Sequence, residues 1–244
     1  MPMKRMTRGV LAGVAAAAVA ASLAVTATSS ASAEPPKKDE PKLAWSDDFD
    51  GAAGTAPDAS KWTHEVNGDG GGNGELQYYT DSTDNAALDG QGNLVITARK
   101  ENPADYQCHY GRCEYTSARL VTSQTFKQKY GHFEARIKVP RGTGIWPAFW
   151  MLGSNIGSTP WPDCGEIDIM ENIGSEPSTV HGSLHGPGYS GGNPITGSYE
   201  NPSGAAFADD FHTFAVDWTA DYIAWSVDGQ EYQRKTPADA GGNA

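Results

Sequence analysis

Three acidic residues stand close together in the stretch Gly-Glu-Ile-Asp-Ile-Met-Glu-Asn: Glu166, Asp168 and Glu171. The apolar residues between them are typical of a β-strand, in which successive side chains point to opposite faces. Glu166 and Asp168 therefore share one face. A regular strand would place Glu171 on the other face, and one extra residue, forming a β-bulge, returns it to the acidic face.

Carboxyl groups that share one surface repel each other, which separates their pKa values and favours acid–base chemistry. Glycoside hydrolysis with retention needs one ionised and one protonated carboxyl group, about 5–5.5 Å apart. A strand rises about 3.4 Å per residue, so two long glutamate side chains must lean together to meet this spacing. Asp168 lies between them and can assist proton exchange. The alternatives are a calcium cluster, whose ligands usually come from loops that wrap the ion, and a solvated acidic strand.

The motif Trp-Pro-Asp-Cys-Gly-Glu-Ile-Asp-Ile-Met-Glu-Asn closely resembles the active-site strand of family 16 glycoside hydrolases, in particular that of the bacterial endo-β-1,3-glucanases (laminarinases). The resemblance runs from about Trp45 to Gln233, and further matching motifs lie at residues 75–80, 92–98, 130–136 and 144–152. It implies Glu166 as the nucleophile, Asp168 as its helper and Glu171 as the acid/base. The inserted residue resembles the laminarinase branch rather than the lichenase branch.

Aromatic residues suit a sugar cleft, because the C–H faces of sugar rings stack on indole rings. Trp146 and Trp150 have same-face spacing on a strand, and Trp161 stands before the acidic motif. By resemblance, Trp146 is a subsite platform on the glycone side of the cut. Trp150 fits either the cleft or the core, and Phe149 fits the core better.

Three polar residues are further candidates for substrate binding. His185, which is followed by Gly-Pro-Gly, resembles the family's cleft histidine near the scissile bond. The resemblance also suggests that the segment with Glu75 and Gln77 lines the cleft. The alternative for these two residues is stabilisation of a turn.

The whole chain suggests one large β domain after a short N-terminal extension. Short β-branched and aromatic runs are separated by Gly-rich turns, which predicts a two-sheet sandwich. Strands are expected at residues 94–98, 115–122, 130–139, 148–152, 166–171, 179–185, 211–217 and 222–227. The resemblance narrows this all-β class to a concanavalin-like β-jelly roll of two antiparallel sheets, whose concave sheet carries the cleft.

The N-terminus has the layout of a secretory signal peptide: basic residues, an Ala-rich apolar run over residues 10–25 and small residues up to Ala33. We expect a signal peptide over residues 1–33, with retention as a membrane anchor as the alternative. The Pro/Lys-rich segment 34–42 is expected to be a disordered linker. The catalytic domain is then expected over residues 43–244, in a secreted, extracellular and monomeric protein.

The formal net charge of −12 disfavours binding to nucleic acid and anionic membranes and suits a neutral polysaccharide. Export favours a disulfide between Cys108 and Cys113, with a metal site as the rival. Two thiols and His109 do not complete a tetrahedral set. Cys164 is expected to be a buried thiol beneath the acidic strand.

The sequence also departs from the family. Family members continue past the Val227-Asp-Gly-Gln turn with further strands, so we expect the jelly roll to lack its last C-terminal strands and the domain to be incomplete. No cofactor is expected in catalysis. Family members often hold a structural calcium ion, for which Asp48 and Gly90 are weak candidates here.

These observations predict a secreted endo-β-1,3-glucanase that hydrolyses laminarin-like β-glucan with retention. One alternative is a non-catalytic β-glucan-binding module on the same fold, although such relatives usually lack the catalytic acids. Another is the same class of enzyme acting on mixed-linkage β-1,3-1,4-glucan, or on a galactan. The shapes of the loops decide between these polymers.

Overall fold

The structure is a computed structural model that describes residues 42–243. The predicted signal peptide, 1–33, and all of the predicted linker except Lys42 lie outside the described residues. The chain divides into the units Met1–Ala44 and Trp45–Ala244, and the fold below is that of the second unit. Within the described part, no helix has the length and apolar character needed to cross a membrane.

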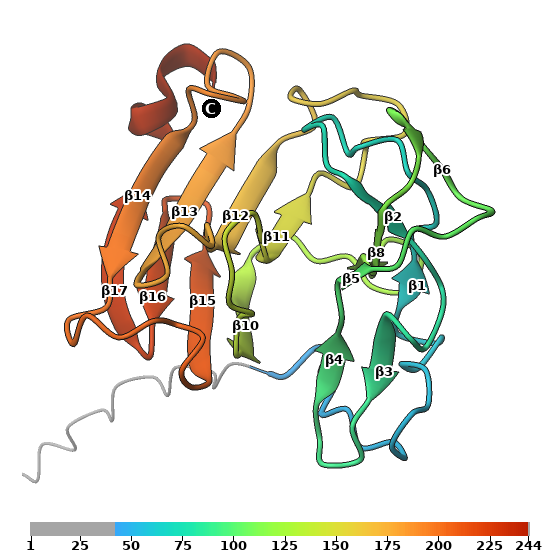
Figure 1. Cartoon of the computed structure of the whole chain (residues 1–244). Helices are drawn as coiled ribbons and strands as arrows, with labels where there is room; N and C mark the ends of the chain where they lie inside the picture. Colours follow the sequence, from blue (N-terminus) through green and yellow to red (C-terminus); the bar gives the residue numbers. More distant parts are fainter. Residues whose placement is uncertain (1–41, 244) are drawn as a thin grey trace, which may run out of the picture. The chain divides into compact units, whose positions relative to one another are not determined.

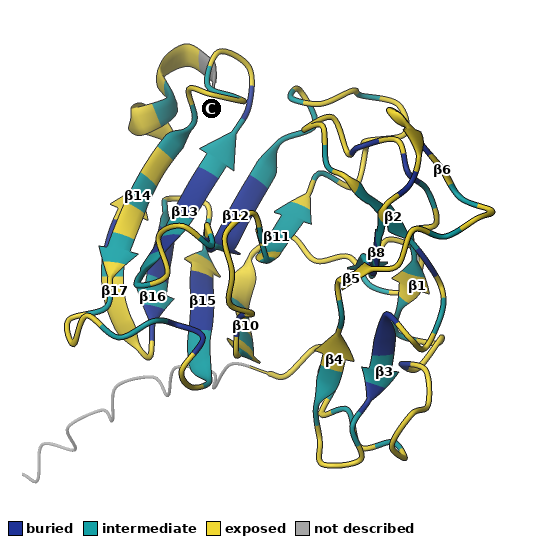
Figure 2. Cartoon of the chain, viewed as in Figure 1, coloured by how far each residue is buried: buried dark blue, intermediate teal, exposed yellow. Residues whose placement is uncertain are grey.

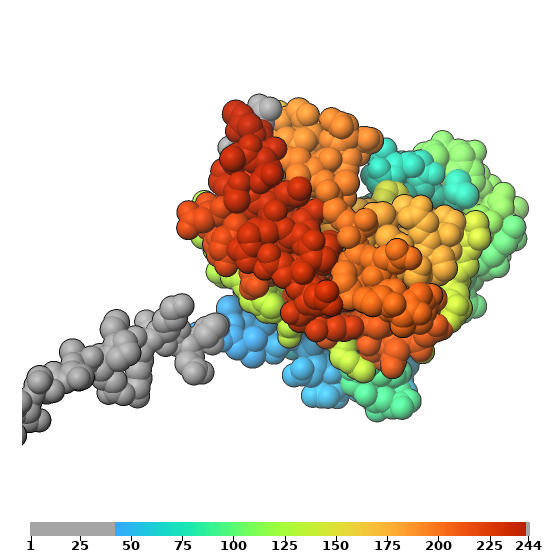
Figure 3. All heavy atoms as spheres, turned by 90° about the vertical axis from the view of Figure 1, so that its left-hand side faces the viewer, coloured from blue at the N-terminus to red at the C-terminus, as the bar shows by residue number. Residues whose placement is uncertain are grey.

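The two largest sheets of this unit are antiparallel and have four strands each, and they lie on the left in Figure 1. The first, here the site sheet, has the strand order β11 (Ala148–Leu152), β12 (Glu166–Glu171), β13 (Thr179–His185) and β14 (Ile195–Glu200). The second, here the backing sheet, has the order β10 (Gly131–Ile137), β15 (His212–Trp218), β16 (Ile223–Val227) and β17 (Gln230–Lys235). Viewed from the side of β14 and β17, the surface consists mainly of the C-terminal part of the chain, orange to red in Figure 3.

The core lies between the two sheets, because each presents an apolar face to the other. The buried positions of β12, β13, β15 and β16 are dark blue in Figure 2. Alternation along these strands directs every second side chain inward, as in other β-sandwiches. The core cluster comprises Val139, Ile167, Ile169, Met170, Val180, Phe207, Ala208, Phe214, Val216, Trp225 and Val227. The sandwich predicted from the sequence is therefore confirmed.

The remaining strands are short, lie within residues 63–121 and form smaller sheets. The pairs are β1 (Thr63–His64) with β9 (Leu120–Val121), β3 (Ala86–Leu88) with β4 (Leu94–Ile96), and β6 (Gln107–Cys108) with β7 (Gly111–Arg112). A three-stranded sheet has the order β2 (Gln77–Tyr79), β8 (Tyr115–Ser117) and β5 (Arg99–Lys100). Its β2–β8 pair is parallel, unlike the antiparallel pairing expected throughout. The one helix among the described residues is the short 3-10 segment Pro237–Asn243.

Each strand expected from the sequence coincides with an observed one, although the expected run 115–122 divides into β8 and β9. In the two large sheets, strands β14 and β17 were not predicted, because their residues are largely polar. The short strands β1, β2, β3, β5, β6 and β7 were not predicted either, because each has only two or three residues. On β14, half-buried and exposed positions alternate, since only one face packs on the rest of the protein. The expectation that the jelly roll lacks its last strands stays a prediction.

Two glycines of the site sheet allow the sheets to approach closely. A Cβ atom on Gly182 would overlap the indole Cδ1 of Trp225 and the hydroxyl of Tyr232, and would lie 2.7 Å from the indole nitrogen. A Cβ atom on Gly197 would overlap the side-chain amide of Gln233. Large side chains of the backing sheet thus fill space that only glycine leaves free.

We predict that Gly182→Ala lowers the free energy of unfolding by about 1–3 kcal/mol, because the added methyl group overpacks the core. The matched control is Gly192→Ala, since a Cβ atom there meets no atom within 4 Å. Urea denaturation of both variants checks this. Equal stability of the two variants would show that the core yields to the extra methyl group.

Candidate active site

The acidic strand β12 contains the predicted β-bulge. Glu166 pairs with His185 and Asp168 pairs with Ser183, but the next pair joins Glu171 to His181. Three steps on β12 thus correspond to two on β13, and the pairing with β11 shifts at the same place. Both residues of the bulge enter the core, with Ile169 2% and Met170 1% exposed. Glu171 consequently returns to the face of the other two acids.

Asp168 lies at the centre of the site and is the most buried of the three acids, with 3% of its surface exposed. His185 Nε2 lies 3.2 Å from Asp168 Oδ2. One carboxylate oxygen of Glu166, one of Asp168 and one ring nitrogen of His185 all lie within 4.8 Å of one another. Trp161 donates a hydrogen bond of 2.8 Å from Nε1 to Glu166 Oε2. The histidine and Trp161, both predicted to bind substrate, are therefore in direct contact with the acidic strand.

Burial is the main cause of the unusual pKa values on this strand. It raises the pKa of Glu166 to about 7, with the charge of Asp168 as the next cause. Burial also raises the pKa of Asp168, although its contact with His185 opposes the rise. The same contact raises the pKa of the histidine. The interaction between the two carboxyl groups raises the pKa of Glu166 and opposes the rise at Asp168, so Glu166 holds a proton more readily than burial alone would make it.

Glu171 has surroundings of its own. Trp146 donates a hydrogen bond of 3.0 Å from Nε1 to Glu171 Oε1. Burial raises the pKa of Glu171, and the indole donor lowers it. The sequence analysis expected repulsion between the carboxyl groups to separate their pKa values, but repulsion is not the main cause of the raised pKa of Glu171. Burial contributes most, and the charge of Glu166 is a minor contribution.

The cluster of Glu166, Asp168 and His185 is also the one group of nearby His, Cys and carboxylate atoms in residues 42–243 that could hold a metal ion. Calcium prefers six to eight oxygen ligands, and an imidazole is not among them. The cluster therefore does not fit the calcium alternative. The candidates for a structural calcium lie elsewhere: Gly90 has a φ of 75°, and a Cβ atom on Gly92 would lie 3.5 Å from the carbonyl oxygen of Asp48. That structural calcium stays a prediction.

The tryptophans differ in their exposure and partners. Trp146 and Trp161 are 50% and 43% exposed, so their rings are open to solvent although their nitrogens bind the acids. Trp150 is half-buried and pairs with Asp168 on the neighbouring strand, which places it on the acidic face. The Arg119 guanidinium lies 4.5 Å from its ring centroid. Phe149 packs against the core, as predicted.

Arg119 was not predicted from the sequence. It lies between Trp150 and Tyr79, whose ring centroid is 5.8 Å from the guanidinium carbon. Tyr79 in turn donates a 2.6 Å hydrogen bond to Glu75 Oε2. These contacts connect the acidic strand to the predicted binding segment of Glu75. The signal that could have indicated this was the isolated arginine in an otherwise uncharged strand run, Thr-Ser-Ala-Arg-Leu-Val.

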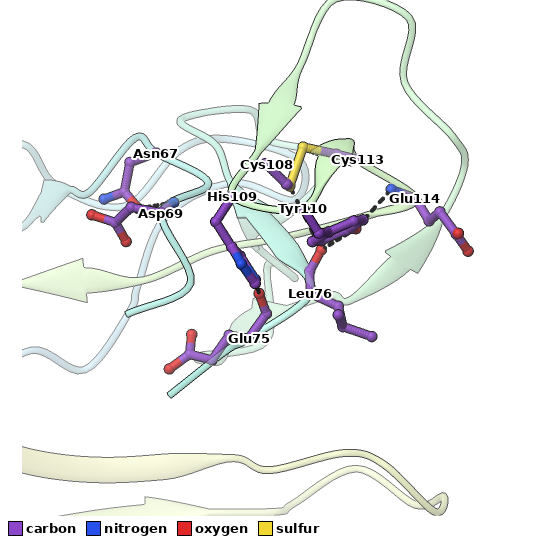
Figure 4. Close-up of a disulfide and its surroundings, with 9 residues drawn as sticks. All are labelled: Asn67, Asp69, Glu75, Leu76, Cys108, His109, Tyr110, Cys113 and Glu114. Atoms are coloured by element: carbon purple, nitrogen blue, oxygen red, sulfur yellow. Dashed lines mark hydrogen bonds between the residues drawn. A yellow bond between two sulfur atoms is a disulfide. The ribbon is translucent and has the colours of Figure 1, made fainter. Parts of the chain in front are cut away.

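The segment with Glu75 and Gln77 is held by its own side chains and by a disulfide-closed hairpin (Figure 4). Gln77 donates a 2.6 Å hydrogen bond from Nε2 to Glu75 Oε2, which fits the turn-stabilising interpretation. In the hairpin, His109 Nε2 lies 3.0 Å from the carbonyl oxygen of Glu75, and Tyr110 donates a 2.7 Å hydrogen bond to that of Leu76. Contact of Glu75 and Gln77 with substrate stays a prediction.

The predicted disulfide between Cys108 and Cys113 is present, with a Cα–Cα distance of 5.1 Å. His109 contacts the chain at Glu75 rather than completing a metal site with these sulfurs. Cys164 has a free thiol but is only half-buried, contrary to the prediction of a buried thiol. It lies in the turn that precedes β12 rather than beneath the strand.

Comparisons with known proteins agree with this geometry. A family model described as glycosyl hydrolases family 16 matches residues 74–243. The chain is 45% identical to the Beta-glucanase of Rhodothermus marinus over 197 residues, covering 79% of the chain and 65% of that protein. It is 38% identical to Glucan endo-1,3-beta-glucosidase A1 of Niallia circulans over 206 residues, covering 80% of the chain and 29% of that protein. The chain thus spans less than two thirds of either relative.

A solved structure gives the same result. The laminarinase catalytic domain of Thermotoga maritima is similar with a TM-score of 0.74 and 47% identity, covering 81% of this chain and 78% of that one. At this identity, the likeness extends to sequence as well as fold.

The two indole donors give a paired prediction. Trp146→Phe removes the donor to Glu171, so the pKa of Glu171 rises, while Trp161→Phe raises the pKa of Glu166. A ¹³C NMR titration of the glutamate carboxyl groups measures both, and each variant is the control for the other. If neither substitution changes the pKa of the glutamate that its tryptophan contacts, these hydrogen bonds do not influence the two pKa values.

Proposed function

The chain belongs to glycosyl hydrolase family 16, and on that premise we propose that it is an endo-acting β-1,3-glucanase that cleaves laminarin-like glucans with retention. The observation that carries this proposal is the bulged strand β12, which brings three carboxyl groups with raised pKa values onto one face. The names of the relatives and of the similar Thermotoga structure support the same substrate class.

In the first chemical step, Glu166 attacks the anomeric carbon and Glu171 protonates the glycosidic oxygen as the C–O bond breaks. The attacking carboxylate must be ionised, whereas the pKa of Glu166 is raised to about 7 in the free protein. The adjacent Asp168 resolves this conflict, because it can accept the proton of Glu166 and leave Glu166 as the anion. His185 supports this exchange through its contact with Asp168.

In the second step, water replaces the enzyme at the anomeric carbon. Glu171, now ionised, removes a proton from the water, which attacks the carbon while the bond to Glu166 breaks. Two displacements at one carbon restore the original anomeric configuration. Burial of Glu171 suits both steps, because a raised pKa favours the protonated form in the first step and makes the carboxylate a stronger base in the second.

The exposed indoles of Trp146 and Trp161 are suited to bind sugar rings. The indole N–H of Trp146 donates a hydrogen bond to Glu171, and that of Trp161 donates one to Glu166. These bonds hold one exposed ring beside each glutamate. Stacking on an indole ring binds the C–H face of an uncharged sugar without distinguishing one sugar residue of the chain from the next. The position of the carboxyl groups determines which glycosidic bond is cut. Trp150, Glu75 and Gln77 are proposed to extend the binding surface.

We propose a secreted, monomeric protein whose partner is the glucan itself. The basic and apolar N-terminal sequence and the Cys108–Cys113 disulfide both suit export to an oxidising compartment. The net charge of −12 is unfavourable for nucleic acid and compatible with an uncharged polymer. Hydrolysis by two carboxyl groups requires no cofactor.

Replacement of the nucleophile tests the proposed function. Glu166→Gln should abolish release of reducing sugar from laminarin, while binding to insoluble β-1,3-glucan is retained, because the amide keeps the shape of the side chain and cannot form the ester. The control is Glu200→Gln at an exposed position of β14, which should keep full activity.

Two results would contradict the proposal. Normal activity of Glu166→Gln would show that another group attacks the sugar. A folded, unsubstituted protein that binds glucan without releasing sugar would instead be a binding module. Comparison with mixed-linkage glucan in the same assay distinguishes the two polymer substrates.

A further inference from the structure

A buried indole of the backing sheet reaches the backbone of the acidic strand. Trp225, on β16, is fully buried and donates a 2.7 Å hydrogen bond from Nε1 to the carbonyl oxygen of Asp168. This oxygen belongs to the last residue before the bulge. A carbonyl in a regular strand points along the sheet toward a neighbouring strand, so a side chain of the opposite sheet reaches it only where the strand turns that carbonyl inward.

The residues opposite the bulge leave room for this indole. Gly182 lies on β13 between Ser183 and His181, the partners of the residues that flank the bulge. Its missing Cβ provides the space in which the Trp225 ring sits. Gln233 makes a second contact of the same kind, because its Nε2 donates a hydrogen bond of 3.0 Å to the carbonyl oxygen of Gly182. Side chains of the backing sheet therefore bind the backbone of β12 and of β13 at the level of the bulge.

The bulge itself determines which side chains face the substrate. Without the extra residue, alternation would direct Met170 to the acidic face and Glu171 into the core. Burial of the Glu171 carboxyl group in the core would be unfavourable, so the burial of side chains already favours the bulged arrangement. The indole hydrogen bond adds a directional contact that fixes the position of one backbone carbonyl oxygen within that arrangement.

We propose that Trp225 is a positioning residue, whose indole N–H fixes the bulged register of β12 and thereby places Glu171 opposite Glu166. Trp225 touches neither the substrate nor the reacting groups and acts through the backbone of Asp168. The inference rests on the proposed function, in that it assigns Glu171 as the acid/base. It extends that function by naming a residue of the opposite sheet on which the geometry depends.

The test is Trp225→Phe, which removes the N–H and keeps an aromatic ring in the core. The matched control is Trp218→Phe on the adjacent strand β15, a half-buried tryptophan that also packs against the core. We expect Trp225→Phe to lower kcat on laminarin by about ten- to a hundredfold, because misplacement of a catalytic group by about 1 Å has an effect of this size. KM should stay within about twofold, since the exposed indoles that bind sugar are unchanged.

The pH profile separates positioning from a loss of folded protein. If the register loosens, Glu171 becomes more hydrated and its raised pKa falls, so the alkaline limb of kcat/KM moves to lower pH. A purely structural role would scale activity equally at every pH. Should Trp225→Phe fail to melt cooperatively, the same assays are made with benzothienylalanine at position 225, which keeps the bicyclic shape and lacks the N–H.

The outcomes are distinct from those of the proposed function. Reduced kcat with a shifted alkaline limb, and neither effect in Trp218→Phe, supports the inference. Unchanged kcat and pH profile in a folded variant without the N–H overturns it, while the unsubstituted protein remains an active glucanase. If the unsubstituted protein itself releases no sugar, the proposed function fails and the assigned role of Trp225 fails with it.

Discussion

The structure depends on one extra residue in β12. A strand can place acids at alternate positions on a single face, but Glu166 and Glu171 are five residues apart, and an odd spacing would send them to opposite faces. The bulge at Ile169 and Met170 removes this conflict, because it turns Met170 into the core beside Ile169. The proposed catalytic arrangement and this apolar packing thus depend on the same irregularity, and neither can be altered alone.

Burial gives the acids their chemistry, and a few polar contacts moderate it. Desolvation raises the pKa of each of the three carboxyl groups and so favours their protonated forms. His185 lowers the pKa of all three acids, while Trp161 also lowers that of Glu166 and Trp146 that of Glu171. Each glutamate therefore has its own indole donor, whereas the histidine acts on the whole group. These differences suit the different parts that we propose for three chemically similar groups.

The sequence predicted what can be read along a single strand. The alternation of Glu166 and Asp168, and the odd step to Glu171, indicated both the strand and its bulge. The contacts made across strands could not be predicted in this way. A pattern shows that Trp225 is apolar and lies in a strand, but its hydrogen bond to Asp168 depends on how two sheets stack. Arg119 was missed for the same reason. Strands β14 and β17 were missed because their polar residues lack the apolar signal of the central strands.

The central claim, that Glu166 is the nucleophile of a retaining β-1,3-glucanase, is tested most directly by covalent trapping. A 2-deoxy-2-fluoro laminaribiosyl fluoride slows the second displacement, so the sugar accumulates on the attacking residue. After digestion, mass spectrometry locates the labelled residue. The account predicts one laminaribiosyl group per chain, attached through an ester to Glu166. A label on Asp168 or Glu171, or turnover of laminarin by a protein that never acquires a label, would contradict it.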